Sequence, residues 1–143
     1  MTDLTTLPDR ALSIRQPWAW AILNAGKDVE NRSRRFHYRG PICIHAAKGC
    51  TAQEYNEFIR AIHHVSLSRP FPPGRRVPPR ADLERGGIVG TAEIVDCVEA
   101  SDSPWFFGPF GLVLANVQPV PFIPVKGALG LFKWKEKKEA QHG

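Results

Sequence analysis

The sequence predicts an α+β protein, a small curved β-barrel of five or six strands flanked by two main helices. Apolar and polar residues alternate over residues 11–15 and 42–46, which is the pattern of half-buried strands. Apolar residues at helical spacing follow over 18–25, and a second helical segment lies further along the chain. The β-branched run 87–98 contains Gly90, which permits the bend that a strongly curved barrel strand needs.

The first helix has a start signal and a stop signal. Pro17 ends the first strand, because proline lacks a backbone donor, and proline is favoured in the first turn of a helix. Trp18 and Ile22 recur at helical spacing, and Gly26 falls where a left-handed C-terminal cap is expected. A turn that carries Lys27 therefore follows the helix.

Residues 27–32, Lys-Asp-Val-Glu-Asn-Arg, concentrate the charged groups of a predicted cleft. Alternation places Glu30 and Arg32 on one face of an extended strand. In a continuous strand Lys27 and Glu30 would point to opposite faces, so they converge only if Lys27 lies in the turn after Gly26. The residues expected to surround this cleft are Arg15, Lys27, Glu30, Arg32, His45 and Lys48.

The remaining segments are interpreted as support for this unit. Thr51 and Glu54 have the form of a capping box, and the helix predicted over 52–64 should pack one face on the barrel. Residues 66–86 are rich in proline and arginine, which predicts a long, mobile surface loop. The aromatic stretch 104–110 should be an ordered loop that either plugs the barrel end or offers a stacking surface.

Length and composition indicate a single domain over residues 1–143 with a basic tail at 135–143. Hydrophobic residues make up 43% and aromatic residues 10% of the chain, which excludes a disordered protein. No apolar run is long enough to span a bilayer, and no signal peptide is evident, so a cytoplasmic protein is expected. The 3 cysteines form no CxxC pair, which predicts reduced thiols, no metal and no cofactor.

The net charge of +5 comes from 19 basic and 14 acidic residues, and the basic residues are clustered. Arginines gather within 32–39 and 75–85, and lysines within 133–138. Such clusters favour phosphate-bearing partners such as RNA. The alternative for each cluster is a solvated basic surface without a ligand.

The pair Lys27 and Glu30 supports two opposed interpretations. As an ion pair, the two groups stabilise each other's charged forms and contribute about 0–1 kcal/mol if exposed. As catalytic groups, a lysine amine that loses its proton on burial can take up a proton or attack a carbonyl, while the carboxylate relays protons. The residues alone leave both interpretations open.

Six segments taken together resemble one known family. They read SIRQPWAWAIL, GKDVENR, IHAAK, GTAEIVDC, SPWFFGPFGLVL and PVKGALGLF, and they extend over roughly residues 10–134. The combined pattern resembles the ASCH domain family of the PUA-like superfamily, and its short EOLA-like members most closely. The resemblance implies a PUA-like fold.

The resemblance also implies an activity. Similar ASCH proteins include metal-independent amidohydrolases that remove the acyl group from N4-acylated cytidine. Their motif carries a catalytic lysine, which falls on Lys27, and a threonine, which falls on Glu30, so a threonine nucleophile cannot be carried over. Water attack remains, with Lys27 and Glu30 sharing the base and acid roles and Lys27 or Arg32 stabilising the oxyanion. Glu93 is the candidate for a further glutamate that such members use.

The candidates for substrate binding are aromatic, polar and basic residues of the same cleft. Trp18 or Trp105 could stack on a pyrimidine, and core packing is the alternative for each. Gln16 or His45 could hydrogen-bond the edge of the base, and Lys126 could bind an anion. The full set is Arg15, Gln16, Trp18, His45, Lys48, Trp105 and Lys126.

A second class of function is a single-stranded RNA-binding module, with ribonuclease activity as a variant. PUA-like barrels bind RNA, and mixed basic and aromatic residues suit a groove in which bases stack. The expected partners are therefore a modified pyrimidine nucleoside or RNA, with no membrane. The protein itself is expected to be a monomer or a weak dimer.

Overall fold

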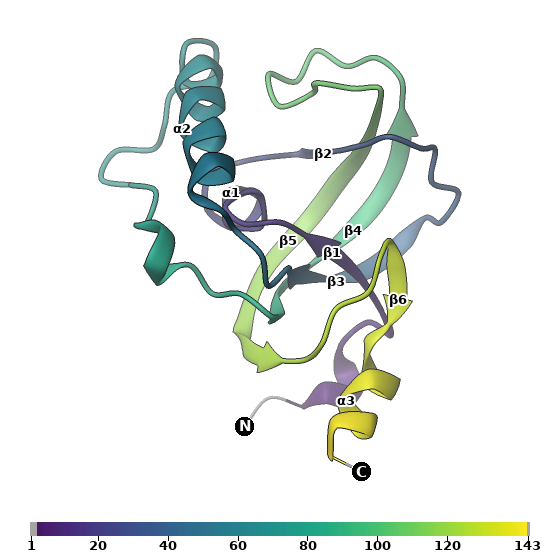
Figure 1. Ribbon diagram of the computed structural model, residues 1–143. Coiled ribbons are helices and arrows are strands. Elements are labelled where there is room, and N and C mark those ends of the chain that lie inside the picture. The colour runs from purple at the N-terminus through teal and green to yellow at the C-terminus, as the bar shows by residue number, and fades with distance from the viewer. Residues whose placement is uncertain (1–2, 143) are drawn as a thin grey trace.

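A computed structural model describes residues 3–142 of the chain and shows a single curled sheet with helices around it (Figure 1). Over these residues the strands are β1 Arg10–Ile14, β2 Val29–Arg32, β3 Gly40–Ala46, β4 Gly87–Val98, β5 Phe110–Pro124 and β6 Leu131–Lys133. The α-helices are α1 Trp18–Asn24, α2 Ala52–Ser66 and α3 Trp134–His142, and short 3₁₀ turns occur at Leu4–Thr6 and Arg80–Asp82.

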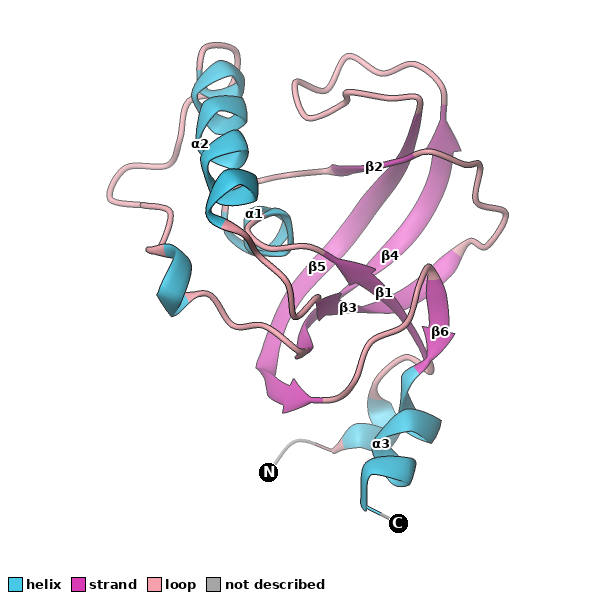
Figure 2. Cartoon of the chain, viewed as in Figure 1, coloured by secondary structure: helices cyan, strands magenta, loops and turns pink. Residues whose placement is uncertain are grey.

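The sheet has the order β2-β5-β4-β3-β1-β6 and is antiparallel except for the parallel pair β1 and β3. The long strands β4 and β5 curve across the molecule, and their pairing contains three register shifts (Figure 2). Such irregularities bend a sheet and increase its twist. Because β2 and β6 lie at opposite edges, the sheet forms an open half-barrel. The predicted α+β class with a small curved sheet of five or six strands is confirmed.

The concave face of the half-barrel holds the main core. Side chains from β1, β3, β4 and β5 pack there with Ala19 and Ile22 of α1. Gly90 of β4 permits this close packing, because a Cβ at that position would lie 2.5 Å from the Leu23 side chain of α1. The helix α1 therefore fills the concave face directly.

The second helix, α2, packs one face against the edge of the half-barrel and against α1. Its Phe58 and Val65 form one buried cluster with Val29 of β2, Ala21 of α1 and Trp105. The predicted packing on the barrel is therefore present at β2, and α1 and the aromatic loop share in it. The capping box is confirmed, since Glu54 N donates to Thr51 Oγ1 and Thr51 N donates to Glu54 Oε1.

Two segments carry more structure than the sequence indicated. Residues 135–143, predicted as a basic tail, form most of α3, with Gly143 outside the described residues. Residues 67–86 are a surface segment held by side-chain contacts, such as Tyr55 Oη donating to the Pro78 carbonyl at 2.7 Å. The mobility of this segment stays a prediction. Within residues 3–142 no helix is long and apolar enough to cross a bilayer.

Candidate functional site

The turn between α1 and β2 positions Lys27. Gly26 adopts φ +71, a left-handed conformation that favours glycine, and the Lys27 amide donates to the Ala21 carbonyl at 3.2 Å. The third residue past the helix thus returns a hydrogen bond to the last turn of the helix, and the left-handed Gly26 makes this reversal possible. Lys27 consequently lies in the turn ahead of β2, as the sequence predicts.

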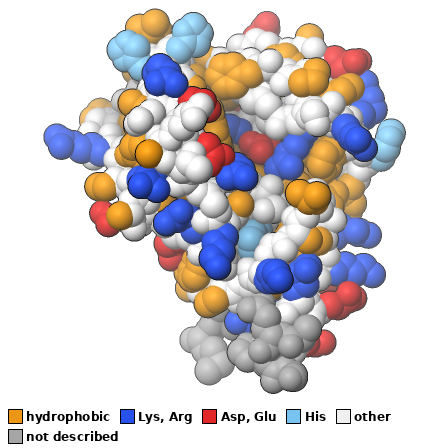
Figure 3. Space-filling model, in the orientation of Figure 1, with side chains coloured by type: hydrophobic (Ala, Val, Ile, Leu, Met, Phe, Trp, Pro, Cys, Tyr) orange, Lys and Arg blue, Asp and Glu red, His pale blue; other side chains and the backbone are white. Residues whose placement is uncertain are grey.

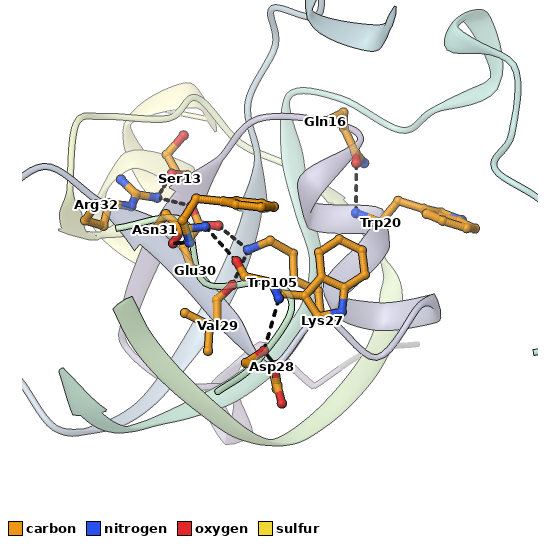
Figure 4. A network of polar contacts seen from close by, with 12 residues as sticks. Ser13, Gln16, Trp20, Lys27, Asp28, Val29, Glu30, Asn31, Arg32 and Trp105 are labelled. Carbon is orange, nitrogen blue, oxygen red and sulfur yellow. Dashed lines mark hydrogen bonds and ion pairs between the residues drawn. The ribbon is translucent and has the colours of Figure 1, made fainter. Parts of the chain in front are cut away.

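Lys27, Glu30 and Arg32 form one chain of polar contacts (Figure 4). Lys27 Nζ donates to Glu30 Oε1 at 2.7 Å and also to the Val29 carbonyl. Arg32 Nη2 donates to Glu30 Oε2 at 3.0 Å and to the Ser13 carbonyl at 2.8 Å. Each oxygen of the Glu30 carboxylate therefore faces a different basic side chain. The predicted convergence of these three residues is present in the structure.

This cluster of Lys27, Glu30 and Arg32, here called the lysine site, is strongly desolvated. Lys27 is 1% exposed and Glu30 is 8% exposed. In its charged form the Lys27 amine carries three N–H donors, and only two have partners among the described contacts. Arg32 Nε is buried without a hydrogen-bond partner among the described residues. A buried donor without a partner is costly, which makes this position suited to a bound oxygen atom.

Aromatic side chains border the lysine site. Lys27 Nζ lies 5.8 Å from the centre of the Trp18 ring, a distance at which a cation is attracted by the ring face. Trp18 in turn contacts Phe107 edge to face, with ring centres 6.4 Å apart. Phe107 is 51% exposed, an unusual position for a phenylalanine. Phe107 thus gives the site an accessible aromatic wall. The face of the molecule drawn in Figure 3 is hollowed near its centre, where basic and acidic side chains meet.

Asn31 fixes the loop that carries this wall. Its Nδ2 donates to the Trp105 carbonyl at 3.0 Å, and its Oδ1 accepts from the Phe107 and Gly108 amides at 2.7 and 3.1 Å. Asp28 supports the same loop by accepting from Ser103 Oγ at 2.6 Å. Because Glu30 and Asn31 point to opposite faces of β2, one strand holds the charged cluster and the aromatic loop together.

A separate pocket lies on the other side of Ser13, with a volume of about 870 Å³. We call it the His45 pocket. Ser13 and His45 are direct neighbours on the parallel strands β1 and β3, and both line it. Basic residues Lys48, Arg85 and Lys126 line it as well, together with Gly127. The sequence-predicted residues His45, Lys48 and Lys126 are therefore brought together, beside the lysine site.

His45 is held in one orientation. Its Nε2 lies 2.7 Å from the Val125 carbonyl, so Nε2 carries the proton and donates. Its Nδ1 is then an acceptor, 3.4 Å from Ser13 Oγ. Burial lowers the pKa of His45, and the hydrogen bond to Val125 opposes this only in part. The imidazole is consequently neutral near pH 7.

Three other candidates take structural positions. Arg15 pairs with Glu54 at the start of α2, at 2.8 Å. Gln16 is buried, and both ends of its amide are used, because Oε1 accepts from the Trp20 amide and Nε2 donates to the Glu84 carbonyl. Trp105 is 1% exposed and packs with α2, so its ring is a plug of the core and not an open stacking surface.

Glu93 is placed away from the lysine site. The neighbouring residues Ala92 and Ile94 point into the core on the concave face, so Glu93 lies on the opposite face of β4. We therefore drop it as a further acid. The three cysteines are buried and free. Among residues 3–142 no three histidine, cysteine or acidic side chains gather as a metal site would require.

The sequence analysis missed Ser13, Asn31 and Phe107 as parts of the site. Their contacts join residues 19 or more apart, which alternation within one strand does not reveal. The alternation of side chains within residues 27–32 could have indicated a role for Asn31, since it places Asn31 on the face opposite Glu30, toward a different neighbour.

The half-barrel with α1 in its concave face is a PUA-like α+β fold, and the turn with Lys27, Glu30 and Arg32 lies at its edge. The chain belongs to the ASCH domain family, whose model matches residues 12–140. It is also similar to the human protein "Activating signal cointegrator 1", with 29% identity over 141 residues. That alignment covers 88% of this chain and 22% of the human protein, so the chain spans only a part of that relative. ASCH domains are associated with RNA binding, and hydrolase activity has been proposed for the family.

Proposed function

We propose that this ASCH domain is an EOLA-like, metal-independent amidohydrolase that removes the acyl group from N4-acylated cytidine. The observation that carries the proposal is the buried contact of Lys27 Nζ with Glu30 Oε1 at 2.7 Å, beside an unpartnered Arg32 Nε. In its charged form Lys27 also has a third N–H, beyond the two that have described partners. Amide hydrolysis needs such donors, because negative charge develops on the acyl oxygen as water adds to the acyl carbon.

The chemistry follows from the positions of the three side chains. Glu30 accepts a proton from a water molecule as the water oxygen bonds to the acyl carbon. The third N–H of Lys27 and the Arg32 Nε–H stabilise the oxyanion of the tetrahedral intermediate. The bond from the acyl carbon to N4 then breaks, and Glu30 returns the proton to N4. The products are a carboxylic acid and cytidine, and no other reactant is consumed.

The aromatic wall suits a pyrimidine. Trp18 borders Lys27, and Phe107 is exposed beside it, so a flat base could lie against these rings with its acylated amine toward Glu30. Trp18 stays a proposed stacking residue, and Phe107 joins it. Trp105 is buried and anchors the loop that carries Phe107.

The first test follows the ultraviolet absorbance of N4-acetylcytidine with purified protein and with the variants Lys27→Met and Glu30→Gln. Wild type should release cytidine, with EDTA present or absent. Both variants should lose at least about 100-fold in kcat, because each removes an acid–base or oxyanion group. Lys27→Met keeps the side-chain volume and leaves Glu30 paired with Arg32, which favours a folded variant.

The matched control is Lys133→Ala, which removes an exposed lysine on β6 and should keep the wild-type rate. Circular dichroism must show that each variant is folded. Full activity of folded Lys27→Met would disprove the mechanism, and no turnover by folded wild type would disprove the activity.

The second candidate function is binding of single-stranded RNA, with ribonuclease activity as its variant. The three basic residues that line the His45 pocket favour it, since phosphate contacts dominate such binding. Under this alternative, oligonucleotide affinity falls steeply between about 50 and 200 mM salt, and hydrolysis of N4-acetylcytidine is absent.

A further inference from the structure

The His45 pocket has no role in the proposed hydrolysis, although it lies beside the lysine site. Its volume of about 870 Å³ is within the range of small-ligand sites. Ser13 joins it to the lysine site, because the Ser13 carbonyl accepts from Arg32 while the Ser13 hydroxyl lies beside His45. A ligand that extends past Ser13 would contact both sites.

The floor of the pocket presents a hydrogen-bond acceptor. The Val125 carbonyl accepts from His45 Nε2, which leaves His45 Nδ1 to accept the Ser13 hydroxyl proton. The lone pairs of Ser13 Oγ then face the pocket and can accept a further hydrogen bond. The absence of a side chain at Gly127 leaves room for the His45 ring, since a Cβ at residue 127 would lie 2.6 Å from that ring.

The rim of the pocket presents positive charge. Lys48 and Lys126 are exposed, Arg85 is half-buried, and they come from three separate segments of the chain. The described residues that line this pocket include three basic side chains and no aspartate or glutamate. A suitable ligand has a hydroxyl group that donates to the floor of the pocket. It also has a negative charge nearby that binds the basic rim.

We propose that the His45 pocket binds the phosphorylated ribose of a nucleotide unit whose acylated base lies at the lysine site. A ribose hydroxyl donates to Ser13 Oγ, and the phosphate lies among Lys48, Arg85 and Lys126. The preferred substrate is therefore a nucleotide, free or within RNA, over the corresponding nucleoside. This step rests on the proposed function for the place of the base, while binding of the ribose phosphate can be measured alone.

The test is calorimetric titration of wild type with CMP, dCMP, cytidine and inorganic phosphate. CMP should bind at least about 10-fold more tightly than cytidine, because charge-assisted contacts to phosphate are the strong ones. The double variant Lys48→Ala/Lys126→Ala should lose this preference, and Lys133→Ala should keep it. Ser13→Ala should bring the affinities of CMP and dCMP together, because only CMP offers the 2′-hydroxyl.

Two further measurements distinguish failure of this inference from failure of the proposed hydrolase activity. With N4-acetylcytidine 5′-monophosphate, kcat/KM should exceed that for N4-acetylcytidine about 10-fold in wild type and equal it in the double variant. A short cytidine oligonucleotide that binds more tightly than CMP identifies RNA as the source of the ribose phosphate, and equal affinity identifies the free nucleotide. Turnover of both substrates without a preference for phosphate would overturn this inference and leave the hydrolase intact. Tight CMP binding without turnover would overturn the hydrolase and the placement of the base.

Discussion

Lys27 owes its position to a single glycine. Gly26 turns the chain in the left-handed region, and Lys27 then reaches Glu30 across a gap that a continuous strand would not allow. Both parts of this geometry are local, so the sequence could predict them. The Ser13 carbonyl that accepts from Arg32 lies on β1, and three strands separate β1 from β2 in the sheet order. The curl of the sheet brings the two residues together, and spacing within one segment could not reveal it.

His45 gives a pH prediction at the level of one residue. Burial lowers the pKa of His45. Near and below pH 6.5 the imidazole is therefore protonated more readily in the unfolded chain than in the folded protein. Stability therefore falls as pH drops from about 7.5 to 5.5, by at most about 1.4 kcal/mol per pH unit from this residue. Urea unfolding of wild type and His45→Gln at both pH values measures it.

The comparison isolates His45 because the other titrating groups are common to both proteins. The variant should lose less stability than wild type between the two pH values, whatever its stability at pH 7.5. Equal losses would show that the imidazole is protonated as readily in the folded state as in the unfolded chain.

Strand β2 is the element that joins the two halves of the candidate site. One face carries Glu30 and Arg32, and the other carries Val29 and Asn31, which hold Trp105 and the aromatic loop. Alternation predicted these faces from sequence. The loop that Asn31 binds is 74 to 77 residues away in the chain, so its attachment needed the structure.

Asn31→Ala tests this role of β2. The variant loses three hydrogen bonds to the loop and should be about 1–3 kcal/mol less stable. Amide hydrogen exchange at Phe107 and Gly108 should accelerate, and KM for the acylated substrate should rise more than kcat falls. The exposed neighbour Ser33→Ala is the control. Unchanged exchange at both amides would refute the positioning role.

Helix α2 shows where prediction from sequence stopped. Its bounds and capping box were readable from local pattern, and the observed helix Ala52–Ser66 extends the prediction by two residues. The sequence predicted packing on the barrel but not the share that α1 has in it, because an apolar stripe is the same whether it faces a sheet or another helix. Only the three-dimensional position of α1 decides that α2 packs on Trp105 and Ala21.

At the scale of the whole molecule, the half-barrel is joined to α3 through Trp134. This side chain is fully buried, and its Nε1 donates to the Pro8 carbonyl at 2.7 Å. Lys135 adds a contact to the Leu7 carbonyl and a pair with Asp9. The N-terminal segment and α3 thereby hold each other against the sheet.

Trp134→Ala should therefore destabilise the whole domain by about 3–5 kcal/mol, the usual cost of removing a buried tryptophan. Trp134→Phe keeps most of the packing and should cost less. Urea unfolding measures both, with Lys133→Ala as the unaffected neighbour. A loss below about 1 kcal/mol for Trp134→Ala would mean that α3 is only loosely attached.

The contact between Pro8 and Trp134 brings the two ends of the described chain together below the sheet, on the side away from β2 (Figure 1). A domain whose two ends lie close together can be inserted into a longer polypeptide without distorting its own fold. Fusion partners or labels attached at either end would then leave the lysine site open. The same geometry makes the chain suited to circular permutation, with new ends in the surface segment 67–86.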